Sequence, residues 1–251
     1  MDAKNGKREF HLTGEFRVAR AEERVAFDRE GGGAAAHEQP AKISPTEGEK
    51  GRGGPPKRYR MITPTDWFRI PLRSEPKRMR AVQILVDKAY PNRDEFAVKR
   101  HELRDLLTEV THNASQREAI EIYLATEAVM GVPIPASLMV TAEPENPSLP
   151  RQMPVSLLAD GIRDRYGEGA QVSVVTLPSG EAVRGRREEL SEDSLELGQD
   201  KARPNTLLEF FLPVPHSTAW LVLTFSAPLK ELADAQVQMF DAIAASFRWS
   251  D

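Results

Sequence analysis

Two strands near the C-terminus place the strongest constraint on what this chain can fold into. The run Leu207–Leu212 reads Leu-Leu-Glu-Phe-Phe-Leu and puts apolar side chains at both even and odd positions of an extended chain. The run Trp220–Phe225 has the same character. Strands that are apolar on both faces need cover on both faces. The sequence therefore predicts a β-sheet that lies between layers of helices.

Four segments show the helical spacing that such cover requires. Residues 229–247 form the last of them, with an apolar stripe that includes Met239, Phe240 and Ile243. Two helices are predicted near the start of the domain, from Ser74 to Tyr90 and from Asn92 to Val110, separated by Pro91. A short helix begins at Val155 and ends at Gly167. The C-terminal helix covers one face, and the earlier helices supply the other.

The remaining strands are predicted from alternation. They cover residues 66–72, 120–125, 134–140, 171–177 and 181–187. Pro135 lies inside the third run and favours an edge strand or a bulge there. The acidic, apolar-poor stretch 188–201 is predicted as a loop. The resulting fold class is α+β, an antiparallel β-sheet sandwiched between helices.

The first 60 residues differ from the rest in composition. They hold 13 of the 34 basic and 10 of the 38 acidic side chains, so this segment is net positive and the remainder net negative. Gly-rich runs such as Gly31–Gly33 bury too little apolar surface to offset the entropy of ordering the chain. We predict a possible short hairpin or binding motif over 1–28, a disordered linker over 29–58 and the sandwich domain over 59–251.

One stretch of the N-terminal segment has a β-like pattern. Phe10 and Leu12 alternate on one side of Thr13-Gly14, and Phe16 and Val18 alternate on the other. A lone hairpin is marginal in water, so this one needs a surface to dock on. It either recruits a partner or folds onto its own domain. The alternative is a disordered tail with scattered aromatic residues.

Composition excludes several classes of protein. The chain has no cysteine, which removes disulfides, thiolate metal sites and a cysteine nucleophile. The net charge of −4 argues against bulk electrostatic binding to nucleic acid. No window approaches the roughly 18 apolar residues of a membrane helix, and no apolar stretch follows the basic start. We therefore expect a cytoplasmic protein that binds neither membrane nor nucleic acid.

Catalytic and cofactor motifs are missing from the sequence. It contains no G-x-S-x-G elbow, no Walker loop and no H-E-x-x-H pair. His101, Asp105, Glu109 and His112 share one side of the second helix, but the two histidines lie roughly 16 Å apart along its axis. We interpret this set as a solvated helix face and expect no metal, no cofactor and no catalytic residue.

Within the folded domain, a cluster of three arginines is the candidate surface for binding a partner. Arg184, Arg186 and Arg187 follow a predicted turn, and either an acidic partner or a phosphate would suit them. The alternative is that they only solubilise an edge strand, where charge discourages unwanted pairing. Neighbouring glutamates make the local net charge near zero.

The order of these elements resembles the Mog1/PsbP-like α/β/α sandwich over residues 61–251. The ending Met239–Trp249 looks like the closing helix of that family, and the Ala, Arg and Pro content is similar to that of actinobacterial proteins. The paired helices at 75–112 are an expansion of the pattern, and there is no lipid-anchoring cysteine. Members of this fold mostly act as binding or assembly modules, which the resemblance implies here.

Three functions follow as hypotheses. The first is a non-enzymatic accessory module that binds a protein partner, with a flexible N-terminal tether giving a second contact. The second is a small-molecule or lipid-binding domain with a cavity between sheet and helices. The third is an enzyme that assembles histidines and carboxylates from distant positions. The sequence leaves the oligomeric state open.

Overall fold

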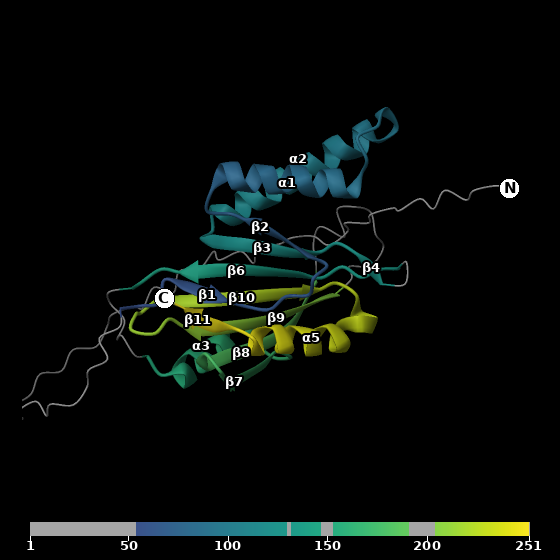
Figure 1. Ribbon diagram of the computed structural model, residues 1–251. Helices are drawn as coiled ribbons and strands as arrows, with labels where there is room; N and C mark the ends of the chain where they lie inside the picture. Colours follow the sequence, from purple (N-terminus) through teal and green to yellow (C-terminus); the bar gives the residue numbers. More distant parts are fainter. Residues whose placement is uncertain (1–53, 130–131, 147–152, 191–203, 251) are drawn as a thin grey trace, which may run out of the picture.

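The computed structural model describes residues 54–129, 132–146, 153–190 and 204–250. Within them, one antiparallel sheet of seven strands forms the centre of the molecule, in the order β2-β3-β6-β10-β9-β8-β7 (Figure 1). The strands are β2 (Trp67–Pro71), β3 (Ala119–Ala125), β6 (Ser137–Glu143), β7 (Gln171–Leu177), β8 (Gly180–Leu190), β9 (Pro204–Pro213) and β10 (Trp220–Ala227). Helices lie on both sides of this sheet, which confirms the predicted α+β fold.

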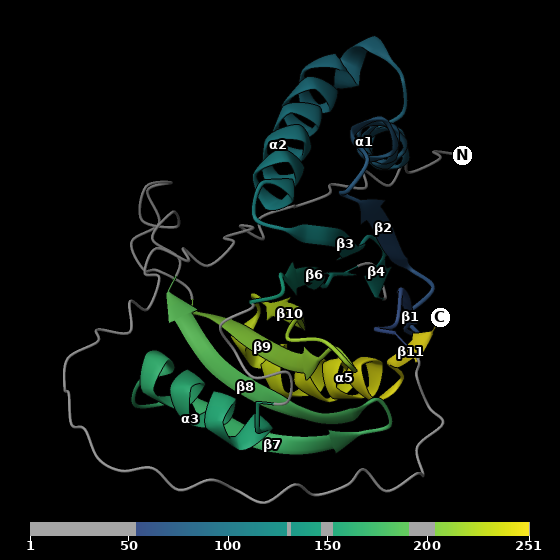
Figure 2. The same cartoon turned by 90° about the vertical axis from the view of Figure 1, so that its left-hand side faces the viewer.

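One face of the sheet, called face A here, is covered by helix α5 (Ala233–Ala245), which follows a 3₁₀ turn at Lys230–Leu232 (Figure 2). Its residues pack with the inward side chains of β6, β9 and β10 in the largest core cluster. Phe225 of β10 stacks on Phe240 of α5 with ring centroids 4.8 Å apart. Aromatic side chains therefore fill the space between α5 and the sheet.

Three helices share the opposite face, called face B. Helices α1 (Glu75–Ala89) and α2 (Ala97–Ser115) pack at the β2–β3 end, with a 3₁₀ turn at Asp94–Phe96 between them. Helix α3 (Val155–Tyr166) packs at the β7–β8 end, where it contacts Val183 and Phe211. Figure 2 shows α3 and the α1–α2 pair at opposite ends of the sheet.

A second, two-stranded sheet joins segments from the two ends of the domain. β1 (Arg58–Arg60) pairs antiparallel with β11 (Arg248–Ser250), with Tyr59 opposite Trp249. Tyr59 also stacks on Phe247, the two rings lying 5.3 Å apart. This small sheet lies on the face-A side of the molecule (Figure 2). A further short pair consists of β4 (Ala128–Val129) and β5 (Val132–Pro133).

Three local predictions need correction. Pro135 does not mark an edge strand: it lies before β6, an inner strand, and its carbonyl oxygen accepts a hydrogen bond from Gln236 Nε2 at 2.9 Å. The loop predicted from Glu188 begins later, because β8 continues along β9 to Leu190. The C-terminal helix ends at Ala245, and the chain then enters β11.

Candidate functional site

The three arginines singled out in the sequence lie on β8 but do not face one surface. Arg184 and Arg186 point to face A, where α5 supplies their partners. Arg184 makes two contacts with Asp241, at 2.7 Å and 3.0 Å, and Arg186 Nη2 lies 2.6 Å from Asp234 Oδ1. These two arginines therefore hold α5 against the sheet.

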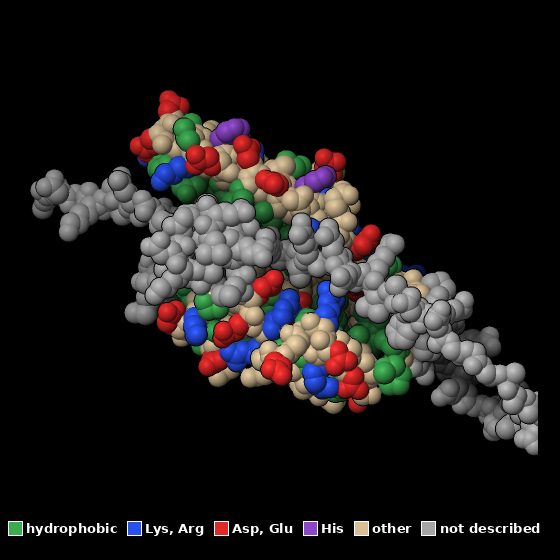
Figure 3. Space-filling view, turned by 180° about the vertical axis from the view of Figure 1, so that it is seen from behind, with side chains coloured by type: hydrophobic (Ala, Val, Ile, Leu, Met, Phe, Trp, Pro, Cys, Tyr) green, Lys and Arg blue, Asp and Glu red, His purple; other side chains and the backbone are tan. Residues whose placement is uncertain are grey.

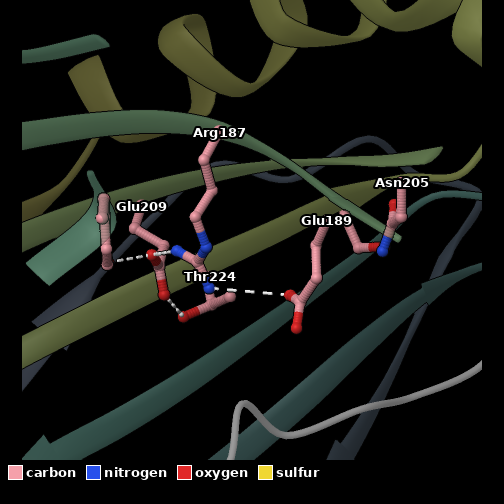
Figure 4. Close-up of polar contacts among 7 residues, drawn as sticks. Arg187, Glu189, Asn205, Glu209 and Thr224 are labelled. Carbon is pink, nitrogen blue, oxygen red and sulfur yellow. Dashed lines mark hydrogen bonds and ion pairs between the residues drawn. The ribbon is translucent and has the colours of Figure 1, made fainter. Parts of the chain in front are cut away.

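Arg187 points to face B and enters a buried cluster, the Glu209 cluster, formed by Arg187, Glu209, Tyr166 and Thr224 (Figure 4). The carboxylate of Glu209 accepts hydrogen bonds from the Tyr166 hydroxyl, from Arg187 Nη1 and, at 3.3 Å, from Thr224 Oγ1. The Arg187 guanidinium also lies over the Tyr166 ring, 4.4 Å from its centroid. One carboxylate thus ties together β8, β9, β10 and α3.

The electrostatics of this cluster keep the Tyr166 hydroxyl protonated and the Arg187 guanidinium charged. Burial and the neighbouring Glu209 charge raise the pKa of the Tyr166 hydroxyl, so it stays a hydrogen-bond donor. Burial acts to lower the pKa of Arg187, but the Glu209 carboxylate outweighs it and leaves that pKa raised. A group that is fully paired and locked in this way holds the fold together rather than exchanging protons with a substrate.

A second buried carboxylate lies on β3, where the ladder with β6 is bulged between Ala119 and Glu121. Glu121 is 2% exposed and accepts hydrogen bonds from the hydroxyls of Tyr59 and Tyr123 and from Arg69 Nε. Burial, together with the Glu121 charge, raises the pKa of both tyrosines. The cluster fastens β1 to the main sheet. The alternating pattern of this strand placed Glu121 on the same side as Tyr123 but did not predict its burial, because β1, which supplies Tyr59, lies 62 positions away in the chain.

The histidine-bearing face of α2 is exposed, as the sequence predicted. His101, Asp105, Glu109 and His112 are all solvent-exposed, and His101 Nε2 lies 3.2 Å from Asp105 Oδ2. Figure 3 shows acidic and histidine side chains along this surface. Within the described part of the chain, no group of three metal-ligating side chains is placed to hold an ion.

Strand β7 forms one edge of the sheet and is the most distinctive surface in the described residues. Its sequence, Gln-Val-Ser-Val-Val-Thr-Leu, contains no charge and no proline. All seven residues pair with β8 in unbroken register, from Gln171 opposite Arg186 to Leu177 opposite Gly180. No strand from the described part of the chain pairs with its outer side, and Val174 is 42% exposed. Edge strands of this length are normally interrupted or charged.

The other edge strand, β2, has the usual protection. It is five residues long, ends at Pro71, and carries Arg69, whose Nε is bound to Glu121 at 2.5 Å. Proline and a paired charge both discourage a further strand from adding there. The two edges of the sheet therefore differ in their capacity to accept another strand.

The other candidate binding residues, Phe10, Leu12, Phe16 and Val18, lie outside the described residues. The β7 edge was missed at the sequence level, although its uncharged run of β-branched residues is visible there. The order of the strands in the sheet could not be predicted from the sequence. The arginines of β8 suggested an edge, whereas the edge is the neighbouring β7.

Comparisons with known proteins concern the fold. The chain matches no protein-family model and no curated protein sequence. Its structure is similar to the crystal structure of LpqN, involved in cell envelope biogenesis of Mycobacterium tuberculosis, with a TM-score of 0.42 and 11% identity over 80% of this chain and 87% of that one. It is also similar to the solution structure of PsbP from Synechocystis, with a TM-score of 0.32 and 10% identity over 76% and 86% of the two chains.

Helices that could span a bilayer are not found among the residues that the structure describes.

Proposed function

We propose that this protein is a non-enzymatic interaction module that binds a partner protein by adding a partner strand to the outer side of β7. The observation that carries the proposal is the seven-residue, uncharged and continuous edge of β7. Unpaired backbone N–H and C=O groups along an edge strand are a ready template for another strand, and main-chain hydrogen bonds then supply affinity.

The side chains around this edge define the partner segment. Val172, Val174 and Thr176 alternate on face B, where Val172 is partly covered and Val174 and Thr176 are exposed. A partner strand in register would place its own alternate side chains beside these three. We therefore propose an extended segment with apolar or β-branched residues at every second position and no charge opposite the centre of β7.

The arginines and the N-terminal motif take different parts in this proposal. Ion pairs within the domain already engage Arg184, Arg186 and Arg187. We therefore propose that the partner binds to the neighbouring strand β7 and not to these arginines. Phe10, Leu12, Phe16 and Val18 remain the proposed second contact, carried on the flexible tether. A cytoplasmic location is part of the same proposal and is tested by fractionation of native cells.

The space between the sheet and α5 is filled by side chains and offers no support for a ligand cavity there. Phe210, Phe225 and Phe240 occupy the interface, and each is at most 1% exposed.

The test uses the full chain with a photoreactive benzoylphenylalanine in place of Thr176, which lies on β7 and is exposed. Crosslinking in native lysate is followed by mass spectrometry of the adducts. The Val174→Lys variant puts a charge in the middle of the edge and should abolish the adducts. The matched control is Val98→Lys on α2, where the replaced side chain is 69% exposed.

Support requires adducts that map to one strand-length segment of a partner, persist in Val98→Lys and disappear in Val174→Lys. Adducts that survive Val174→Lys would overturn the proposal. Adducts to a second copy of this chain, or to its own residues 9–18, would also overturn it by identifying a different occupant of the edge.

A further inference from the structure

Buried arginines in the described residues differ in how their charge is balanced. Arg100 is 7% exposed and has Asp87 at 2.5 Å, and the partly buried Arg187, whose side chain is 16% exposed, has Glu209. Arg78, on α1, is equally buried at 7% but is paired with no carboxylate in the described part of the chain. The contrast sets Arg78 apart from the other buried arginines.

The contacts that Arg78 does make are to neutral groups. Its Nη1 lies 3.1 Å from Ser115 Oγ and 3.4 Å from the Leu72 carbonyl oxygen, while its Nε is buried and has no hydrogen-bond partner. A guanidinium cannot shed its charge at any ordinary pH. Burying a charge without a counter-charge is expensive, and proteins normally supply an anion for it.

Arg78 lines an open pocket of about 300 Å³ between the end of β2, the start of α1 and the end of α2. Arg73, His112 and Ser115 also line it, and so do the carboxylates of Glu75 and Glu118. The pocket is therefore polar, with basic groups on the α1 and α2 sides and two acidic groups that limit how much negative charge it tolerates.

The start of α1 adds a second attraction for an anion. Ser74 occupies the N-cap position, but its side chain makes no capping hydrogen bond, and Pro76 follows in the first turn. The N–H groups of the first turn of a helix lack partners within the helix, and the helix dipole makes that end positive. Anions bind at such helix ends when a further group is there to receive them.

We infer that this pocket binds a small oxyanion, a phosphate or carboxylate group, which pairs with Arg78 at the N-terminus of α1. The pocket lies at the β2 end of the sheet and is independent of the β7 edge. Glu75 and Glu118 oppose a second negative charge, so the site favours a singly charged group. Arg78 is the binding residue, and Ser115 positions its guanidinium.

The experiment titrates the full-length protein with inorganic phosphate and, in a second arm, with acetate. Binding is followed by isothermal calorimetry and by the rise in melting temperature, at constant ionic strength. Arg78→Gln should weaken binding at least tenfold. Arg80→Gln, on the exposed side of the same helix, should leave it unchanged. Glu118→Gln removes an opposing charge at the pocket and should strengthen binding severalfold.

The two arms separate the sources of the oxyanion, because preference for phosphate indicates a phosphorylated ligand and preference for acetate a carboxylate. Absence of saturable binding of either anion up to roughly 10 mM would overturn the inference, and so would equal weakening by Arg78→Gln and Arg80→Gln. If Arg78→Gln fails to fold, the gain expected for Glu118→Gln decides the question alone. In that case, an affinity of Glu118→Gln for the anions equal to that of the wild type would reject the site.

Discussion

Buried glutamates fix the geometry of this molecule at the scale of single residues. Glu121 and Glu209 lie on different strands and opposite faces, yet each accepts hydrogen bonds from an arginine and at least one tyrosine hydroxyl. A buried carboxylate is stable only when such donors surround it. Neither cluster was predictable, because each includes a tyrosine from a distant segment: Tyr166 lies 43 positions from Glu209, and Tyr59 lies 62 positions from Glu121.

The buried tyrosines predict how stability depends on pH. The pKa values of Tyr59, Tyr123 and Tyr166 are all raised, chiefly by burial, above the value of about 10 that they have in the unfolded chain. Below pH 10 both states keep these protons, so the contribution of the hydroxyls to stability is fully present. Above pH 10 the unfolded chain loses protons that the folded chain retains, and the free energy of unfolding falls.

Urea unfolding between pH 8 and pH 11 measures this effect. Each tyrosine contributes a slope of up to about 1.4 kcal/mol per pH unit above pH 10. Tyr166→Phe removes one titrating group, so its curve should fall less steeply than that of the wild type, whatever its stability at pH 8. Parallel curves for the two proteins would show that Tyr166 does not stay protonated in the fold.

Local pattern predicted most elements correctly, because their signals lie within a few residues. Helix α1 starts after Ser74, and α3 ends just before Gly167, whose φ of 70° suits glycine. The hairpin of β7 and β8 turns where Pro178 and Gly180 indicated. The pairing of β1 with β11 was missed, because it joins residues 58 and 250 and no local pattern reports so distant a partner.

The attachment of α5 to the sheet gives a prediction at the scale of elements. Asp241, whose side chain is 41% exposed, accepts two hydrogen bonds from Arg184. Asp234, whose side chain is 84% exposed, accepts one from Arg186. Asp241→Asn should lower the free energy of unfolding by about 1–2 kcal/mol. Asp234→Asn is the matched control on the same helix and should cost about 0.5 kcal/mol, as exposed pairs do.

Chemical denaturation of both variants provides the measurement. An equal loss in the two would mean that the buried, two-contact geometry of Arg184 adds nothing to the attachment of α5.

At the scale of the whole molecule, the sheet has one protected end and one open end. The apolar character of β9 and β10 was enough to predict a sheet covered on both faces. It did not reveal which strand lies at the edge, since strand order depends on pairings between distant segments. The candidate surface on β7 could therefore be identified only once the neighbours of each strand were known.

The boundary between tether and domain leads to the last prediction. The domain was expected to begin at residue 59, but β1 begins at Arg58 and brings Tyr59 to Glu121 and Phe247. A deletion that tests the tether must therefore end at residue 53. Deleting residues 1–53 should change the free energy of unfolding by no more than about 0.5 kcal/mol, because every contact of β1 within the described residues is kept. It should weaken partner association by removing the proposed second contact.

Deleting residues 1–60 is the informative comparison. It removes β1, leaves β11 unpaired and takes one hydrogen-bond donor from the buried Glu121, so it should destabilise the domain by about 2 kcal/mol or more. Urea unfolding measures both deletions, and the yield of crosslinks at position 176 measures association. If deletion of 1–53 leaves that yield at the wild-type level, the N-terminal motif makes no second contact and β7 alone must account for binding.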